Sequence, residues 1–245
     1  FNWLQPLTDF MEANPQAGIC QPKMLSEANP SMFEYAGACG GFIDKYGFPF
    51  CRGRILSCVE EDKGQYDTPL KVFWASGACM MIRSQIWREL GGLDESFFAH
   101  MEEIDLCWRT QLYGYEVWAA PQSYVFHVGG GTLPNNSPRK LYLNYRNNLL
   151  MLHKNLPING SRNTFIFKRM CIDGLSGIVY ILQGKFQYFK AVLRAHKEFK
   201  KMRNSTPITL LQPCFKNASN VVSKGIYRKS IIAQFFMGKR EFRKL

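Results

Sequence analysis

Asp94-Glu-Ser-Phe-Phe-Ala-His-Met-Glu-Glu-Ile-Asp-Leu-Cys-Trp-Arg109 is the stretch that says most about this chain of 245 residues. Its three clustered carboxylates belong to Glu102, Glu103 and Asp105. Apolar residues recur at four-residue spacing at Ile104, Trp108 and Leu112, which predicts a helix over 102–112. The acids then lie in its first turn, where negative charge is favourable beside the positive end of the helix dipole.

The residues after this helix predict two short apolar strands, 117–120 and 124–128, on either side of Pro121. His127 would lie at the end of the second strand and face the acid-bearing turn. Acids that cap a helix and a histidine at a strand end are common structural features. Aromatic residues surround these acids, however, and a carboxylate held against apolar walls binds a proton or a metal more tightly, as catalytic carboxylates do.

An ordered series of motifs extends outward from this stretch. It comprises GGFIDKYGFPFCRGR (40–54), WASGACMMIR (74–83), GGLDESFFAHMEEIDLCWR (91–109), GYEVWAAP (114–121), YVFHVGGG (124–131) and a tail over 142–157. The series resembles the second half of the catalytic domain of the family-2 inverting glycosyltransferases, close to the rhamnosyltransferase-like members. The resemblance implies an α/β fold: the C-terminal portion of a three-layer GT-A domain over 1–134, followed by a mainly helical, basic extension over 135–245.

The resemblance also implies roles for individual residues. In the acidic motif Glu-Asp-x-Asp-Leu-x-x-Arg the second acid is the general base, and Glu103 holds that position with one methylene more than the commoner aspartate. Glu102 and Asp105 complete the catalytic acids, and Arg109, the arginine of the motif, is a candidate substrate-binding residue. His127 is similar to a histidine that joins the shell of a divalent cation, Mg²⁺ or Mn²⁺. Trp74, Gly77 and Ala78 match a segment that lines the sugar site.

The metal-binding Asp-x-Asp motif of that family does not occur in the sequence. We therefore expect the chain to begin just after this motif, to lack the half that binds the nucleotide base, and to be inactive by itself. Arg52 and Arg54 are candidate phosphate ligands because guanidinium groups match phosphate oxygens, although arginines on a surface loop are an equal alternative. We further expect a helix over 3–14, a strand over 17–20 and an irregular excursion over 36–69.

Charge divides the chain into two parts. Residues 1–134 hold 9 Lys and Arg against 16 Asp and Glu, a net charge of −7, whereas residues 135–245 hold 22 against 3, a net charge of +19. The eight cysteines form no C-x-x-C pair, so they are interpreted as core residues of a reducing compartment rather than as a zinc site at Cys51 and Cys58.

Residues 186–202 alternate aromatic and basic side chains, which is typical of a helix that lies on an anionic membrane surface, unless the aromatic side chains simply pack in a core. We expect a peripheral location on the inner, cytoplasmic face of the cell membrane. Residues 129–138 are rich in glycine and form either a lid over bound substrate or a linker.

Three functions compete. The first is inverting transfer from a nucleotide diphosphate sugar to a lipid-linked or polysaccharide acceptor. The second is a non-catalytic basic module that binds membranes or nucleic acid; no nucleic-acid motif is present, so no specific nucleic-acid partner is expected. The third, glycoside hydrolysis, requires acids on opposite sides of a bond, whereas Glu102 and Glu103 are neighbours. The first is favoured.

Overall fold

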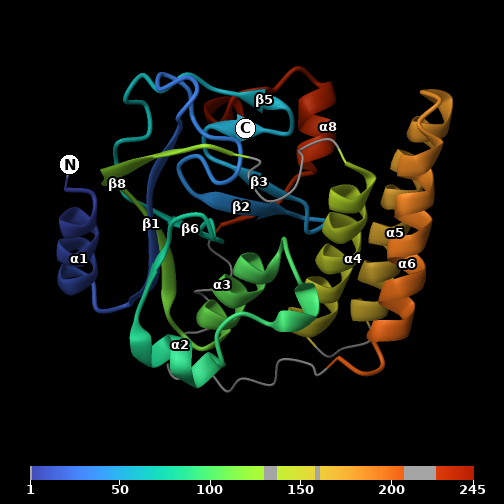
Figure 1. Ribbon diagram of the computed structural model, residues 1–245, viewed down its shortest axis with the longest axis horizontal. Helices are drawn as coiled ribbons and strands as arrows, with labels where there is room; N and C mark the ends of the chain where they lie inside the picture. Colours follow the sequence, from blue (N-terminus) through green and yellow to red (C-terminus); the bar gives the residue numbers. More distant parts are fainter. Residues whose placement is uncertain (1, 130–136, 158–160, 207–224) are drawn as a thin grey trace. The chain divides into compact units, whose positions relative to one another are not determined.

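The computed structural model describes residues 2–129, 137–157, 161–206 and 225–245 (Figure 1). The chain forms two compact units. Unit 1 comprises Phe1–Leu93, Leu106–Gly129 and Leu211–Leu245, and unit 2 comprises Asp94–Asp105 and Gly130–Leu210. This division differs from the predicted boundary at residue 134, because the acidic stretch joins the helical unit while the end of the chain joins the first unit.

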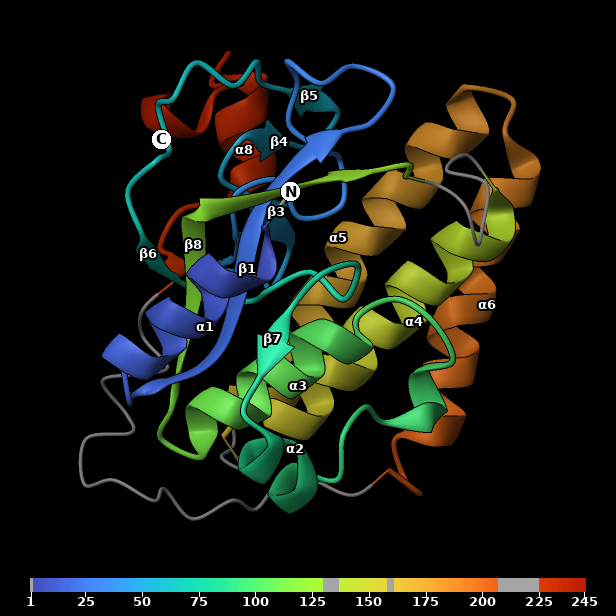
Figure 2. The ribbon, with the colours of Figure 1, turned by 60° about the vertical axis from the view of Figure 1, so that its left-hand side comes forward.

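A four-stranded sheet in the order β6-β8-β1-β7 organises unit 1. Its strands are β6 (Leu70–Val72), β8 (Glu116–His127), β1 (Ala17–Ser26) and β7 (Met81–Ile82). The long strands β1 and β8 run parallel, side by side (Figure 2). The two short strands pair antiparallel at the edges. The mixed α/β prediction is therefore confirmed.

The strand β8 corrects the prediction of two short strands around Pro121, because it is continuous over Glu116–His127. Its pairing with β1 is irregular where the prolines lie: Gln21 pairs with Ala119, and the next paired residues are Lys23 and Tyr124. Proline has no N–H to donate to a sheet, so it is tolerated at such an interruption. The predicted strand over 17–20 likewise extends through Pro22 to Ser26.

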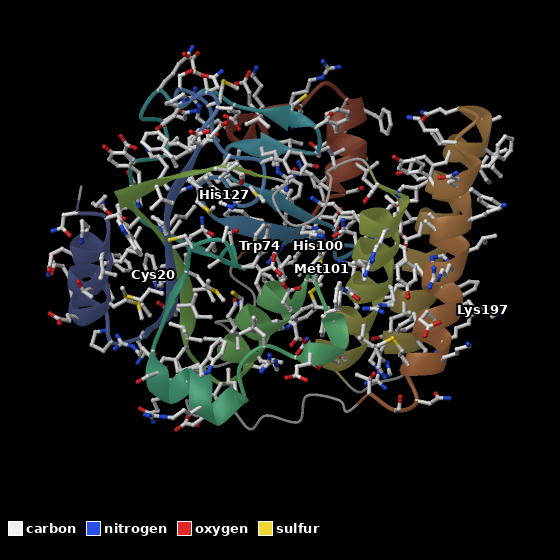
Figure 3. The ribbon with its side chains drawn as sticks, viewed as in Figure 1. Cys20, Trp74, His100, Met101, His127 and Lys197 are labelled. Atoms are coloured by element: carbon white, nitrogen blue, oxygen red, sulfur yellow. The ribbon has the colours of Figure 1, made fainter. Side chains whose placement is uncertain are left out.

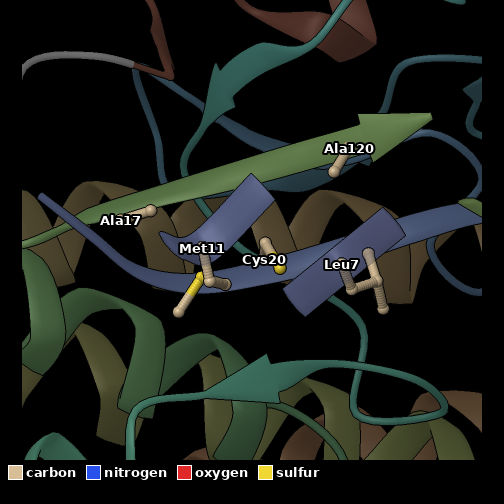
Figure 4. Packing of buried hydrophobic residues seen from close by; sticks show 5 residues of the cluster. All are labelled: Leu7, Met11, Ala17, Cys20 and Ala120. Carbon is tan, nitrogen blue, oxygen red and sulfur yellow. The ribbon is translucent and has the colours of Figure 1, made fainter. Parts of the chain in front are cut away.

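The helix α1 (Leu4–Ala13) covers the sheet with one apolar face, as predicted. Leu7 and Met11 lie one turn apart and pack with Ala17, Cys20 and Ala120 (Figure 4). The helix ends at Asn14, and Pro15 follows it. These contacts bury part of one face of β1 and β8.

The segment predicted as irregular forms most of a second sheet instead. The sheet has the order β5-β4-β3-β2-β9 and consists of β5 (Cys58–Val59), β4 (Arg54–Ile55), β3 (Pro49–Cys51), β2 (Gly41–Asp44) and β9 (Ile226–Tyr227). Phe50 and Ile55 form its core together with Ile231, the first residue of α8 (Ile231–Phe236). A turn η2 (Phe242–Lys244) completes the described chain. The strands are too short to give a clear alternating pattern, which explains why the sequence did not predict them.

Unit 2 contains three long helices, α4 (Pro138–Asn155), α5 (Ser161–Leu182) and α6 (Phe186–Met202), and a turn η1 (Glu95–Phe97). The helices α5 and α6 lie side by side (Figures 1 and 2). A buried polar group joins α4 to α5: Arg169 donates hydrogen bonds to Asp173 and to Asn148. The prediction of a mainly helical basic half is thus confirmed by these three helices, while the short strand β9 joins a sheet of unit 1.

Two further helices, α2 and α3, lie between β7 and β8 in the sequence. The helix α2 (Ser84–Leu90) ends at Gly91, whose φ of 71° is left-handed and suits glycine. The helix α3 (Glu102–Leu112) has the bounds that the spacing of its apolar residues predicted. None of the helices in the described ranges is long and apolar enough to cross a membrane.

Candidate active site

The loop that leads into α3 has an unusual backbone. Phe98, His100 and Met101 all have left-handed φ values, of 65°, 69° and 75°. His100 and Met101 lie next to each other immediately before the helix (Figure 3). Non-glycine residues pay a free-energy cost in this conformation, and such residues cluster at functional sites because the surrounding structure must hold them there. The loop therefore points to the acids that follow it.

Glu102 and Glu103 follow this loop as the first residues of α3. In each side chain Oε2 is enclosed and has no hydrogen-bond partner in the described structure. Burial, and then the charge of the neighbouring Glu102, raise the pKa of Glu103 to about 7. Burial also raises the pKa of Glu102. A carboxylate whose pKa is near neutrality can both accept and release a proton, which is what a general base requires.

His100 contributes a further enclosed polar atom. Its Nε2 has no hydrogen-bond partner among the described residues, and burial together with the charge of Lys140 lowers its pKa. The imidazole is therefore neutral at pH 7. His100 was not predicted as a site residue, and the only signal for it was its place two residues before the acids.

Two neighbouring side chains of α4 hold the strained loop in place. The Asn147 amide Nδ2 donates to the backbone oxygens of Phe97, Ala99 and His100 at 2.9, 2.8 and 2.7 Å. Arg146 donates from Nη2 to the oxygen of Phe97 at 2.9 Å and from Nε to Asn147 Oδ1 at 2.8 Å. Asn147 is completely buried. We call this pair of residues the α4 clamp.

The sequence did not predict the clamp, because no local pattern distinguishes Arg146 and Asn147 from the polar residues of an ordinary amphipathic helix. The one available signal was an amide within an apolar run, since a buried amide must bond to something. The contacts are long-range in sequence, spanning about fifty residues. No local pattern encodes them.

Replacing Asn147 with alanine is expected to lower the free energy of unfolding by about 1–3 kcal/mol, because buried backbone oxygens lose their donor. We expect the amides of residues 97–101 to exchange their hydrogens faster than in the parent protein. Urea denaturation and amide exchange measure the two effects. Asn144→Ala, one turn earlier on α4, is the matched control; a clamp variant as stable as this control would contradict the assignment.

Asp105 was predicted to be catalytic, but its side chain is fully buried in an ion-paired cluster. Lys154 Nζ lies 3.0 Å from Asp105 Oδ2 and 2.6 Å from Asp94 Oδ2. Asn155 donates from Nδ2 to Asp105 Oδ1 at 2.7 Å. Burial alone would raise the pKa of Asp94, yet the hydrogen bonds from Lys154 and Ser96 lower it. We call this group the Lys154 cluster. It joins the end of α4 to the start of α3, so Asp105 helps to hold the start of α3 in position.

The predicted sugar-lining segment lies in unit 1. Trp74 is buried, donates from Nε1 to the oxygen of Phe42 at 3.0 Å, and covers Gly41, where a Cβ would lie 2.0 Å from the indole ring. Gly77 and Ala78 form an exposed turn. Trp74 thus attaches the start of this segment to β2, and the exposed turn follows three residues later.

Gln21 accepts a hydrogen bond from Ser76, the residue before this turn. Its Oε1 accepts from the backbone N–H of Ser76 at 2.8 Å, and the Ser76 hydroxyl donates to the oxygen of Ala36 at 2.7 Å. Ala78 N–H in turn donates to Ser76 Oγ at 3.3 Å. Gln21 is fully buried, and no local pattern of residues indicated that it supports the turn.

The three arginines predicted to bind substrate have structural partners. Arg52 donates to the oxygens of Cys39 and Thr68, and Arg54 to the oxygen of Leu56. Arg109 donates to the oxygens of Leu90 and Gly92 at 2.7 and 2.8 Å. All three are buried. The surface-loop interpretation of Arg52 and Arg54 was wrong, because both are buried, and substrate binding by the three arginines stays a prediction.

His127 ends β8, as predicted. Its Nδ1 accepts a hydrogen bond from the N–H of Gly129 at 3.3 Å and lies 3.5 Å from Oε1 of the buried Glu34. Within the described ranges no group of three or more His, Cys, Asp and Glu side chains could hold a metal ion. His127 belongs to unit 1 and Glu103 to unit 2, so their common pocket stays a prediction. The proposed lid over 129–138 lies largely outside the described residues.

No protein-family model matches the chain. It is 25% identical over 119 residues to a low-salt glycan biosynthesis hexosyltransferase of Haloferax volcanii, covering 46% of this chain and 38% of that protein. Over 56 residues it is 36% identical to the N-acetylglucosaminyl-diphospho-decaprenol L-rhamnosyltransferase of Mycobacterium tuberculosis, covering 23% and 18% of the two chains. It is 32% identical over 56 residues to a rhamnosyltransferase of Escherichia coli, covering 23% and 21%.

Among solved structures, the crystal structure of GalNAc-T7 with UDP, GalNAc and Mn²⁺ aligns with a TM-score of 0.49 and 14% sequence identity, covering 91% of this chain and 38% of that chain. The chain spans 18–38% of the length of the curated relatives named above. In sequence it is similar to hexosyltransferases and rhamnosyltransferases, which confirms the resemblance to glycosyltransferases that its motifs predicted.

Proposed function

We propose that this chain is part of an inverting glycosyltransferase that moves a sugar from a nucleotide diphosphate donor to a glycan or lipid-linked acceptor. The observation that carries the proposal is Glu103, whose pKa is raised to about 7 at the strained entrance to α3. The sequence similarity to sugar transferases supports the same chemistry.

In this proposal Glu103 accepts the proton of the acceptor hydroxyl while that oxygen attacks the anomeric carbon. Attack from the face opposite the departing diphosphate inverts the configuration. Burial, together with like-charge repulsion from Glu102, holds the pKa of Glu103 near neutrality. The α4 clamp and the Lys154 cluster keep the start of α3 in position.

His127 and Glu34 are the residues that we propose for a divalent cation. Nδ1 of His127 accepts a hydrogen bond from Gly129, so it carries the lone pair of the ring, and it lies 3.5 Å from Oε1 of Glu34. These two atoms could bind one cation in place of that hydrogen bond. Two protein ligands suit Mg²⁺ or Mn²⁺, which commonly complete their shells with water and substrate phosphates. A bound cation would offset the negative charge that develops on the diphosphate.

The acceptor class is supported by one relative. The name of the Mycobacterium tuberculosis protein indicates an N-acetylglucosaminyl-diphospho-decaprenol acceptor, which is a lipid-linked sugar. We extend this class to the present chain, and with it a location on the cytoplasmic face of the membrane. The exposed turn at Gly77 and Ala78 is the part of unit 1 that we propose contacts the donor sugar.

The pH dependence of transfer tests the proposal. In the longest natural protein that contains these 245 residues, kcat/KM should rise with pH through about 7, because the base acts only when deprotonated. Glu102→Gln removes a like charge and should move this rise of kcat/KM, the acidic limb of the pH profile, to lower pH. Glu95→Gln, an exposed residue nearby, should leave it unmoved. A rate that is flat across this range, or a limb that Glu102→Gln does not move, would argue against Glu103 as the base.

A further inference from the structure

An apolar stripe runs along the outward face of α5. It comprises the exposed residues Phe167, Cys171, Leu175, Ile178 and Leu182, which we call the α5 stripe. Successive members are four, four, three and four residues apart, which keeps them on one face of a helix. Leu182 is 81% exposed and Leu175 62%. Exposed apolar residues are usually scattered singly, so a continuous stripe indicates a surface that contacts a partner.

The opposite face of α5 explains why these residues point outward. Ile166, Arg169, Asp173 and Gly177 are the buried residues of the helix. A Cβ at Gly177 would lie 3.2 Å from the ring of Phe189 on α6, so the two helices approach closely there. The inner side of α5 is therefore already occupied, and the stripe cannot be a part of the core of unit 2.

The helix α6, which packs beside α5, carries positive charge on its exposed face. Its exposed basic residues are Lys190, Arg194, Lys197, Lys200 and Lys201. Lys197 lies on the side of α6 that faces away from α4 (Figure 3). The two helices hold only two carboxylates, of which Asp173 is fully buried and bonded to Arg169, and Glu198 is half-buried. No fully exposed carboxylate of α5 or α6 offsets this charge.

The sequence-based expectation that residues 186–202 lie on an anionic membrane surface stays a prediction. Part of the apolar side of α6 is buried within unit 2, through Ala191, Val192, Ala195 and Phe199. Phe199 fits the core-packing alternative, whereas Phe186 and Leu193 are 59% and 52% exposed. Most of the exposed apolar side chains of these two helices belong to α5.

We propose that the α5 stripe and the basic face of α6 together form a docking surface for an anionic phospholipid membrane. The stripe enters the boundary between headgroups and acyl chains, and the lysines meet the lipid phosphates. A 22-residue helix such as α5 lies along the membrane plane over roughly 33 Å. Charge complementarity selects this occupant: a second copy of the chain would bring another basic face against the first, whereas anionic lipid neutralises it.

Sedimentation with vesicles tests the docking surface. The chain should bind phosphatidylglycerol-containing vesicles in preference to pure phosphatidylcholine, and binding should weaken as salt increases. Changing Lys197, Lys200 and Lys201 together to glutamine should weaken binding about 100-fold, since each basic residue near an anionic surface contributes roughly a fivefold factor. Lys45→Gln with Lys63→Gln, at exposed positions in unit 1, is the matched charge control.

The stripe is tested separately by Leu175→Gln, Ile178→Gln and Leu182→Gln in one protein. These exposed changes should leave the circular dichroism spectrum unaltered and reduce vesicle binding at least about tenfold, because apolar area no longer leaves water. Leu4→Gln with Leu70→Gln is the control for exposed leucines elsewhere. Unchanged vesicle binding by the stripe variant would overturn the proposal. So would a dimer in lipid-free sedimentation that this variant converts to monomer, since the stripe would then be a self-association interface.

Discussion

Glu103→Gln is expected to lower the transfer rate by about 10²–10⁴, the usual contribution of a general base. The amide has the shape of the carboxyl group but cannot accept the proton of the acceptor hydroxyl. Because the pKa of Glu103 is raised to about 7, its neutral form is already well accommodated, so the uncharged amide should not disturb the fold. Single-turnover rates in the longest natural protein that contains this chain measure the loss.

The same substitution at Glu95 supplies the control. Glu95 lies on the surface in η1, eight residues before Glu103, and its replacement should leave the rate within about twofold. Donor affinity should be similar in both variants, because the general base acts on the acceptor. Near-normal turnover by Glu103→Gln would remove this residue from the proposed mechanism, whereas a joint loss of donor binding would indicate a structural effect.

Lys154→Met is expected to lower the free energy of unfolding by about 3–5 kcal/mol, the usual cost of removing one partner from a buried ion pair. The ammonium group of Lys154 lies between Asp94 and Asp105, and Asp105 is fully buried. Without the lysine these carboxylates repel each other in a poorly solvated place. Urea denaturation monitored by circular dichroism measures the effect.

Two comparisons sharpen this experiment. Lys63→Met removes an exposed lysine that pairs with Glu61, and exposed pairs contribute at most about 1 kcal/mol. Adding Asp105→Asn to Lys154→Met should recover part of the lost stability, because one of the unpaired charges disappears. The difference between parent and Lys154→Met should also shrink in acid, since Lys154 helps to lower the pKa of Asp94 and its contribution is lost when that carboxylate is protonated. A Lys154→Met protein as stable as the Lys63→Met control would show that the cluster does not hold α3.

Local patterns predicted the helices well. Four-residue spacing of apolar side chains placed α3 at its observed bounds, and the same reasoning found α1 and the helical character of the basic half. His127 was correctly placed at a strand end, because the apolar run before it had the length of a strand. These features depend on residues close together in the sequence, where periodicity is informative.

Long-range pairing decided what the sequence could not predict. Pro121 suggested a break between strands, but an irregular register opposite Pro22 accommodates it within β8. Arg52 was expected to be free for a ligand, yet its donors bond to the oxygens of Cys39 and Thr68, and such partners are invisible to periodicity. The α4 clamp is the most consequential example, since it fixes the loop before Glu103 from a helix some fifty residues away.

The strand β9 also sets an order of events during synthesis of the chain. The backbone N–H of Ile231 donates to Asp44 Oδ2 across 187 residues, and β9 pairs with β2 at Ile43 and Asp44. The ribosome must therefore release the chain through Ile231 before this edge of the small sheet closes. Until then Phe50 and Ile55 lack the isoleucine that completes their core, and such a nascent chain exposes apolar surface of the kind that chaperones recognise.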